Sequence, residues 1–268
     1  MRKLPRELIK LGAVGYLNAR PLTWALDRSP DRWDLRYDVP SVCASLLQRG
    51  EIDLGLVPSI EYLQSPDYRF VPGIGIGARG AVASVALFTR VPVESIRSIA
   101  LDTSSRTSVT LIRVLTRHKY GIEPEFVSHA PDLAAMTREH DAAVLIGDPA
   151  LEVDHGALGL QKIDLGEEWV AMTGLPFIFA AWTGRPGAID AEGIQALQAA
   201  QAEGVASSRA IAEEYGRGDA AATARAAVYL RDNVKYGLGL EEAAGLQLFL
   251  DYAADLGLAP RKRRLEFF

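Results

Sequence analysis

The sequence predicts an α/β protein built as a two-lobe clamshell, with a ligand cleft between the lobes. Short apolar runs alternate with helical periods, and each run ends in residues that cap helices. This alternation indicates parallel strands with helices packed on the faces of the sheets. The units form two pairs, at residues 11–63 and 98–153, with a similar order of elements. A chain of 268 residues is long enough for two lobes of about 100 to 150 residues, each with its own core.

The first pair begins with a strand at 11–16, which leads into a helix that ends near Asp27. Asn18 is the expected N-cap of this helix, and Pro21 lies in its first turn.

A second helix is predicted at 42–49, with Ser41 as its N-cap and Gly50 as its left-handed C-cap. The strand that follows, at 53–57, leads through a Pro-Ser pair at 58–59 into a short helix.

The second pair repeats this order. A strand at 98–101 precedes a helix whose apolar positions are 109, 112 and 115. Asp132 opens a further helix that ends near Glu139, and a strand at 142–146 leads into the last short helix of the pair.

Two extended runs, at 81–89 and 176–182, connect the pairs and are predicted to be hinge strands. The first lobe is therefore predicted to comprise residues 1–88 and 182–268, and the second lobe residues 89–181. An Ala-rich helical region at 190–258 is expected to pack against the first lobe.

Polar residues at the strand ends indicate a site for a small anion. Ligands of such sheets bind beyond the carboxyl ends of the strands, where helix N-termini present free N–H groups. The segment 102–108 contains five Ser or Thr residues in its last six positions, which is more than a helix cap requires. Asp102 and Asp148 also lie at strand ends and could act as bases. A helix N-terminus lowers a carboxyl pKa, however, and helix capping explains both residues without a catalytic role.

Composition excludes several classes of protein. The formal charge of −5 and the lack of a basic stripe argue against nucleic-acid binding. The single cysteine, Cys43, cannot form an intrachain disulfide, and the four histidines show no spacing that would bind zinc. No P-loop, GxSxG or dinucleotide fingerprint occurs, so no metal and no cofactor are expected. Without a signal-peptide core or a membrane-length apolar run, a cytoplasmic protein without a membrane partner is expected.

Five segments together resemble the MqnA family, the chorismate dehydratases that begin the futalosine route to menaquinone. The resemblance extends from about residue 10 to residue 255. The segments that carry it are VGYLNARPL at 14–22, GEIDLGLVP at 50–58, DTSSRTS at 102–108, GDPA at 147–150 and TGLPFIFAAW at 173–182. The resemblance implies a type II periplasmic-binding-protein fold used as an enzyme. The implied reaction converts chorismate, a dianion, into 3-[(1-carboxyvinyl)oxy]benzoate and water.

The resemblance also implies roles for particular residues. Asn18 would place its amide beside the reacting ring, and Ser84 would be a second hydrogen-bonding group of the catalytic site. Most of the remaining residues would bind the substrate from the walls of the two lobes. These residues are Tyr16, Pro58, Ser59, Ser105, Thr107, Ser108, Gly147 and Asp148.

The general base is left open, and so are three other functions. One hypothesis for the base is substrate assistance, in which a carboxylate of chorismate takes the proton. The nearest alternative function is that of the sister enzyme of the same pathway, 1,4-dihydroxy-6-naphthoate synthase. A non-catalytic small-anion receptor and a ligand-sensing domain of a regulator are the others. The oligomeric state is not predicted.

Overall fold

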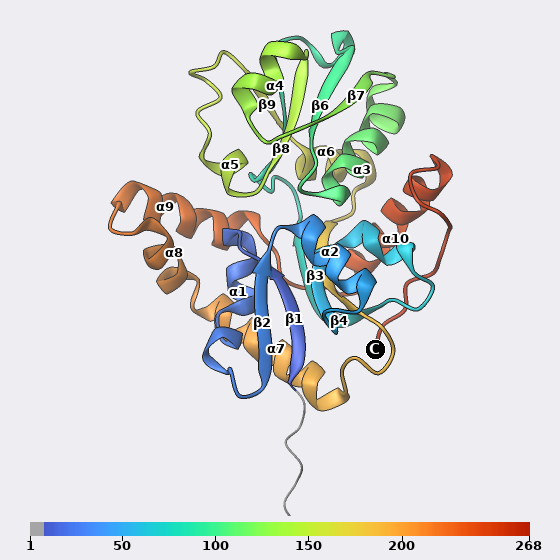
Figure 1. Cartoon of the computed structure of the whole chain (residues 1–268). Coiled ribbons are helices and arrows are strands. Elements are labelled where there is room, and N and C mark those ends of the chain that lie inside the picture. The colour runs from blue at the N-terminus through green and yellow to red at the C-terminus, as the bar shows by residue number, and fades with distance from the viewer. Residues whose placement is uncertain (1–7) are drawn as a thin grey trace, which may run out of the picture.

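Two five-stranded sheets of the same plan organise residues 8–268, the part of the chain that this computed structural model describes (Figure 1). The first seven residues of the predicted first lobe lie outside the described residues. In the first sheet the order is β2-β1-β3-β10-β4, and in the second it is β7-β6-β8-β5-β9. The strands of the first sheet are β1 (Ile9–Val14), β2 (Trp33–Asp38), β3 (Leu54–Pro58), β4 (Arg69–Ala78) and β10 (Phe177–Gly184). Those of the second are β5 (Val85–Thr89), β6 (Ser98–Asp102), β7 (Glu125–His129), β8 (Ala142–Ile146) and β9 (Gln161–Asp164).

The shared plan confirms the predicted α/β class and the two similar lobes. In each sheet three strands are parallel, as expected: β2, β1 and β3 in one, and β7, β6 and β8 in the other. The fourth strand of each sheet, β10 or β5, is antiparallel to its neighbours, so both sheets are mixed rather than wholly parallel.

The chain crosses between the sheets at two places that differ from the predicted hinge strands. β5 lies wholly in the second sheet and β10 wholly in the first, so the predicted boundaries at 88/89 and 181/182 fall inside these two strands. The first crossing, 79–84, is irregular, and Ala83 within it has a φ of 65°. Asp164 fixes this crossing by accepting hydrogen bonds from the N–H groups of Val82 (2.9 Å) and Ala83 (2.6 Å). The second crossing is the turn at 174–176, and we propose these two segments as the lobe boundaries.

Helices cover the faces of each sheet (Figure 1). α2 packs on β1 and β3, while α7 packs on α1 and β4; α8 and α9 form a hairpin beside the junction of the lobes. α10 contacts β10 and also α3 of the second lobe, so the C-terminal region touches both lobes. The helices associated with the first sheet are α1 (Arg20–Thr23), α2 (Pro40–Arg49), α7 (Ala191–Ala206), α8 (Ser208–Gly216), α9 (Ala220–Val228) and α10 (Leu240–Asp255). Those of the second are α3 (Arg106–Leu115), α4 (Leu133–Glu139), α5 (Gly147–Glu152) and α6 (Leu165–Thr173).

Three helix ends form as the local sequence predicts, and one does not. Ser105 and Asp132 cap α3 and α4 by accepting backbone hydrogen bonds, and Gly50 ends α2 with a φ of 72°. Ser41 does not cap α2, because that helix begins two residues earlier than predicted, at Pro40, with Val39 in the N-cap position.

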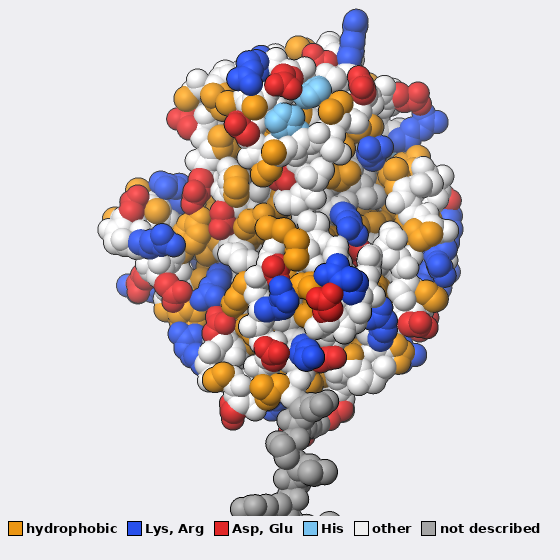
Figure 2. Space-filling model, viewed as in Figure 1, with side chains coloured by type: hydrophobic (Ala, Val, Ile, Leu, Met, Phe, Trp, Pro, Cys, Tyr) orange, Lys and Arg blue, Asp and Glu red, His pale blue; other side chains and the backbone are white. Residues whose placement is uncertain are grey.

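The outer surface carries charges of both signs. Figure 2 shows acidic and basic side chains interspersed over both lobes on this face. Among residues 8–268, no helix combines the length and apolar character that a membrane span requires.

Candidate active site

A cavity opens between the two sheets, at the carboxyl ends of β1, β3 and β8. Its volume is about 50 Å³, which is smaller than the roughly 300–1,000 Å³ of typical small-molecule sites. We call it the central cavity. Most of its wall is apolar, and both lobes contribute to it. The lining residues are Val14, Tyr16, Asn18, Pro40, Leu56, Pro58, Ile76, Val85, Ser105, Ser108, Ile146, Gly147, Phe179 and Ala180.

The N-terminus of α3 supplies one polar wall of the central cavity. Ser105 has an extended backbone, and its Oγ accepts the N–H of Ser108 at 3.4 Å. The two hydroxyl groups lie 3.1 Å apart. The free N–H groups and positive dipole end of a ten-residue helix favour an anion at this point. The wall therefore matches the anion site predicted from segment 102–108.

Asn18 supplies a second polar wall, although its predicted role as an N-cap is wrong. The chain forms a 3₁₀ turn at Leu17–Ala19, and α1 begins afterwards without a side-chain cap. The Asn18 side chain therefore lines the central cavity, where its Oδ1 is buried and has no hydrogen-bond partner among residues 8–268. An unsatisfied buried acceptor costs about 1–3 kcal/mol, so this atom favours a ligand that donates a hydrogen bond.

Ser84 lies behind the cavity wall rather than on it. Its side chain is 1% exposed, and its Oγ accepts a hydrogen bond of 2.6 Å from the hydroxyl of Tyr229. Its carbonyl oxygen accepts the N–H of Gly147 at 2.8 Å, so Ser84 also supports a residue that lines the cavity. Complete burial raises the pKa of Tyr229.

Tyr16 and Gly147 meet across the mouth of the cavity. Gly147 has a φ of 69°, and a Cβ built there would lie 3.0–3.1 Å from the ring of Tyr16. Glycine is needed here both for the left-handed backbone and for the close approach of the ring. Burial raises the pKa of Tyr16, which therefore stays protonated and neutral.

Ser59 and Thr107 join the lobes and do not line the central cavity. Thr107 Oγ1 accepts the N–H of Ile60 at 3.2 Å, and it lies 3.4 Å from the hydroxyl of Ser59. Ser59 also donates to the carbonyl oxygen of Ile178 at 2.7 Å. Their neighbour Pro58, also predicted to bind the substrate, does contribute to the cavity wall.

Asp148 lies outside the central cavity as well. It lines a neighbouring pocket, which we call the side pocket, together with Leu17, Glu152 and Tyr215. The hydroxyl of Tyr215 donates a hydrogen bond to the carboxylate of Glu152. Burial, strengthened by the negative charge of Glu152, raises the pKa of Asp148 to about 6. The expectation that a helix N-terminus would lower this pKa is therefore wrong, because desolvation outweighs the effect of the short helix.

Asp102 has a structural role. Its buried carboxylate accepts hydrogen bonds from the N–H groups of Ser104 (2.9 Å) and Ile146 (3.3 Å). It thereby ties the carboxyl ends of β6 and β8 together below the cavity.

Sequence reasoning missed two contributors to the site. Tyr229 belongs to an Ala-rich helical region without a polar motif, so nothing local marked it. The other is the ion pair between Glu61 of the first lobe and Arg106 of α3, at 2.9 Å. Glu61 is 1% exposed, and its partner lies beside the capping residue Ser105. This contact fixes the N-terminus of α3 against the first lobe.

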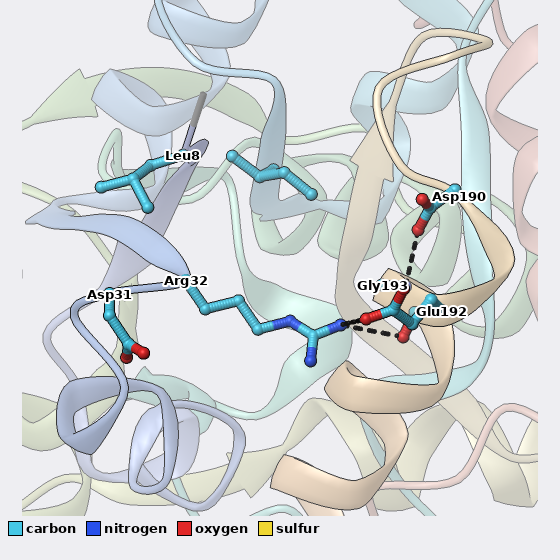
Figure 3. Close-up of a pocket in the computed structure, with 7 residues that line it drawn as sticks. Leu8, Asp31, Arg32, Asp190, Glu192 and Gly193 are labelled. Atoms are coloured by element: carbon cyan, nitrogen blue, oxygen red, sulfur yellow. Dashed lines mark hydrogen bonds and ion pairs between the residues drawn. The ribbon is translucent and has the colours of Figure 1, made fainter. Parts of the chain in front are cut away.

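A further pocket lies at the opposite edge of the first sheet, near the start of β1 (Figure 3). Arg32 reaches across it and donates to the carbonyl oxygen of Glu192 (3.2 Å) and to its carboxylate (3.4 Å). Asp190 accepts the N–H of Gly193 at 2.8 Å and so caps α7. These contacts hold α7 on the lobe, far from the strand ends that form the central cavity. No group of three or more metal-ligating side chains occurs within residues 8–268.

Comparisons with known proteins agree with this arrangement. A family model described as menaquinone biosynthesis matches residues 9–255. The chain is 30% identical over 271 residues to the chorismate dehydratase of Thermus thermophilus, covering 93% of this chain and 96% of that protein.

Solved structures show the same fold at lower identity. A protein from Archaeoglobus fulgidus matches with a TM-score of 0.73 and 19% identity, over 93% of this chain and 98% of that one. The periplasmic aliphatic sulphonate binding protein of Escherichia coli matches with a TM-score of 0.68 and 20% identity, over 96% and 90%. The two-lobe chain thus has the periplasmic-binding-protein-like fold.

Proposed function

The chain belongs to the menaquinone biosynthesis family, and on that premise we propose that it is a chorismate dehydratase. The observation that carries the proposal is its 30% identity, over 93% of its length, to a curated chorismate dehydratase. The enzyme is then a carbon–oxygen lyase that acts on a small dianionic substrate. A cytoplasmic location is part of the proposal, as the sequence composition favours.

The proposed reaction is an elimination that makes the ring aromatic. A ring C–H bond breaks and its electron pair forms the new ring double bond, while the neighbouring C–O bond breaks and the hydroxyl group departs. The proton and the hydroxyl group together leave as water, and the product is 3-[(1-carboxyvinyl)oxy]benzoate. Because aromatisation drives the reaction, the protein mainly has to orient the ring, stabilise developing charge and exclude water.

The polar walls of the central cavity suit this task. Ser105, Ser108 and the N-terminus of α3 would bind one carboxylate, and no lysine or arginine is among the residues that line the cavity. Asn18 would accept a hydrogen bond from a hydroxyl of the substrate through its unpartnered Oδ1. Contacts between the lobes, such as Thr107 with Ile60, would keep the cavity closed to water.

The base in this proposal is a carboxylate of the substrate itself. No histidine lines the central cavity, Asp102 accepts two backbone hydrogen bonds, and Asp148 lines the side pocket. Substrate assistance needs only that the cavity hold the substrate carboxylate near the ring proton.

The test is to incubate the purified protein with chorismate in metal-free buffer containing EDTA and to follow the products by chromatography with mass detection. A product lighter than chorismate by one water supports the proposal and excludes a receptor. Chorismate that stays unchanged while it raises the melting temperature of the protein indicates a binding protein. If there is neither turnover nor binding, the substrate of the sister synthase is the next to assay.

A further inference from the structure

The hydroxyl of Tyr229 lies between the two residues to which catalytic roles are assigned. It donates to Ser84 Oγ at 2.6 Å, across 145 positions of sequence. Burial raises the pKa of this hydroxyl, and the side-chain amide of Asn18 acts on the pKa in the opposite direction. Tyr229 begins the π-helical turn Tyr229–Asn233 after α9, and its side chain is 2% exposed. A buried polar group with these partners holds them in fixed positions, because its alternative is an unsatisfied hydroxyl.

The hydrogen bond from Tyr229 holds the hydroxyl of Ser84 behind the cavity wall. Ser84 Oγ accepts a hydrogen bond from the hydroxyl of Tyr229. Within the described residues, the Ser84 hydroxyl makes no other hydrogen bond. Because Ser84 lies behind the wall of the central cavity, it affects the site through its neighbours rather than through contact with a ligand. Ser84 precedes Val85 and supports Gly147 through its carbonyl oxygen, and both of those residues line the central cavity.

The same hydroxyl orients the amide of Asn18. A side-chain amide has an NH₂ group that donates and an oxygen that accepts. If the NH₂ group of Asn18 faces Tyr229, its oxygen is left without a protein partner, which is the arrangement the structure shows for Oδ1.

We propose that Tyr229 is a positioning residue, which fixes Ser84 behind the cavity wall and leaves the oxygen of Asn18 as an acceptor toward the substrate. This inference rests on the proposed chorismate dehydratase activity. Tyr229 does not line the central cavity and acts only through its two partners. Loss of its hydroxyl leaves Ser84 and Asn18 in place but free to adopt other orientations. Misorientation of this kind lowers kcat more than it raises KM, because a correctly aligned geometry matters most in the transition state.

Tyr229→Phe is the test variant, and Tyr236→Phe is its matched control. Tyr236 is also buried in the C-terminal region, but within the described part of the chain its hydroxyl has no hydrogen-bond partner. Both substitutions remove one buried hydroxyl and keep the ring. We expect kcat for chorismate to fall about 10- to 100-fold in Tyr229→Phe, with KM changed less than about 3-fold, and both constants to stay near wild type in Tyr236→Phe.

Two further measurements separate positioning from a general loss of structure. In the double variant Tyr229→Phe/Ser84→Ala, kcat should fall by less than the product of the two single losses, since both changes disrupt one unit. The side-chain amide signal of Asn18 in an NMR spectrum should shift in Tyr229→Phe and not in Tyr236→Phe, whether or not substrate is present.

The outcomes distinguish this inference from the proposed function. A wild-type protein that leaves chorismate unchanged overturns both. A wild-type protein that turns over chorismate, with a Tyr229→Phe variant equal to Tyr236→Phe in kcat and in the Asn18 signal, overturns the positioning role alone. Fully multiplicative losses in the double variant also overturn it.

Discussion

The backbone N–H of Leu17 donates to Asp148 Oδ1 at 3.0 Å, and this bond joins the loop after β1 to the start of α5. It connects the two lobes across 131 positions of sequence and keeps the Asp148 carboxylate facing the side pocket.

Asp148→Asn should therefore retain substantial turnover of chorismate. Asparagine keeps the oxygen that accepts the Leu17 N–H but removes any function as a base. We expect kcat within about 10-fold of wild type, below the 10²–10⁴-fold that general base catalysis contributes. Steady-state kinetics measure this, and complete loss of kcat with substrate binding intact would instead identify Asp148 as the base.

The pKa of Asp148 gives a stability prediction with a defined sign. Burial raises this pKa from 3.8 to about 6, so between these values the folded protein binds more protons than the unfolded chain. The free energy of unfolding should fall as pH rises through this window, by at most about 3 kcal/mol. Denaturant unfolding of wild type and Asp148→Asn at pH 4 and pH 7 measures the difference, because the other carboxyl groups are common to both. Equal pH dependence in the two proteins would contradict the prediction.

Arg106→Gln should destabilise the protein by leaving the buried Glu61 without its cation. Removing one member of a buried ion pair costs about 3–5 kcal/mol, and we expect about 1–3 kcal/mol because Arg106 is 43% exposed. Arg117→Gln is the control, since the partner of Arg117, Glu123, is exposed and its loss should cost less than about 0.5 kcal/mol. Adding Glu61→Gln to Arg106→Gln should restore most of the loss. Equal unfolding free energies for the two arginine variants would be inconsistent with a buried pair.

Ser105→Ala should weaken both the helix and substrate binding. Loss of a serine cap costs about 0.5–2 kcal/mol, and loss of the hydroxyl beside the substrate carboxylate should raise KM about 10-fold. Asp132→Ala removes the equivalent cap of α4, which contributes no residue to the central cavity. Calorimetry should show similar losses of stability in the two variants, whereas kinetics should show a raised KM in Ser105→Ala alone. A raised KM in both would assign the effect to stability.

Gly147→Ala should impair substrate binding more than its backbone strain explains. Alanine in a left-handed conformation costs about 1–2 kcal/mol, and the added Cβ would press on the ring of Tyr16. Gly121→Ala is the control, because Gly121 has a φ of 65° and open space where a Cβ would be. Both variants should lose stability. KM should rise about 10-fold in Gly147→Ala alone, which corresponds to a loss of about 1.4 kcal/mol in binding free energy. An unchanged KM in Gly147→Ala would show that the Tyr16 contact does not shape the site.

Several elements could be predicted from the sequence because their causes are local. Gly50 ends α2 in the left-handed conformation that glycine adopts most easily, and Ser105 and Asp132 cap their helices with adjacent side-chain oxygens. The apolar runs that form β6 and β8 are buried strands as expected. Each of these features depends on residues within four positions of one another.

Some residues of the candidate site could be placed from the sequence, and others could not. The polar wall at Ser105 and Ser108 was readable from the sequence because an excess of hydroxyl groups marked a helix start. The place of Ser84 was not, because its partner Tyr229 comes from the C-terminal region and no local pattern links them.

Asn18 is the clearest case in which the prediction from local sequence is wrong. Its sequence context fits an N-cap, but the chain forms a 3₁₀ turn at Leu17–Ala19, and α1 begins at Arg20 without a side-chain cap. Periodicity and capping act over a few residues, so the α/β class, the two pairs of elements and some helix ends follow from the sequence, although the predicted caps at Asn18 and Ser41 do not form. Which side chains line the central cavity depends on the packing of the two lobes, because packing brings distant residues within hydrogen-bond distance and buries their polar atoms.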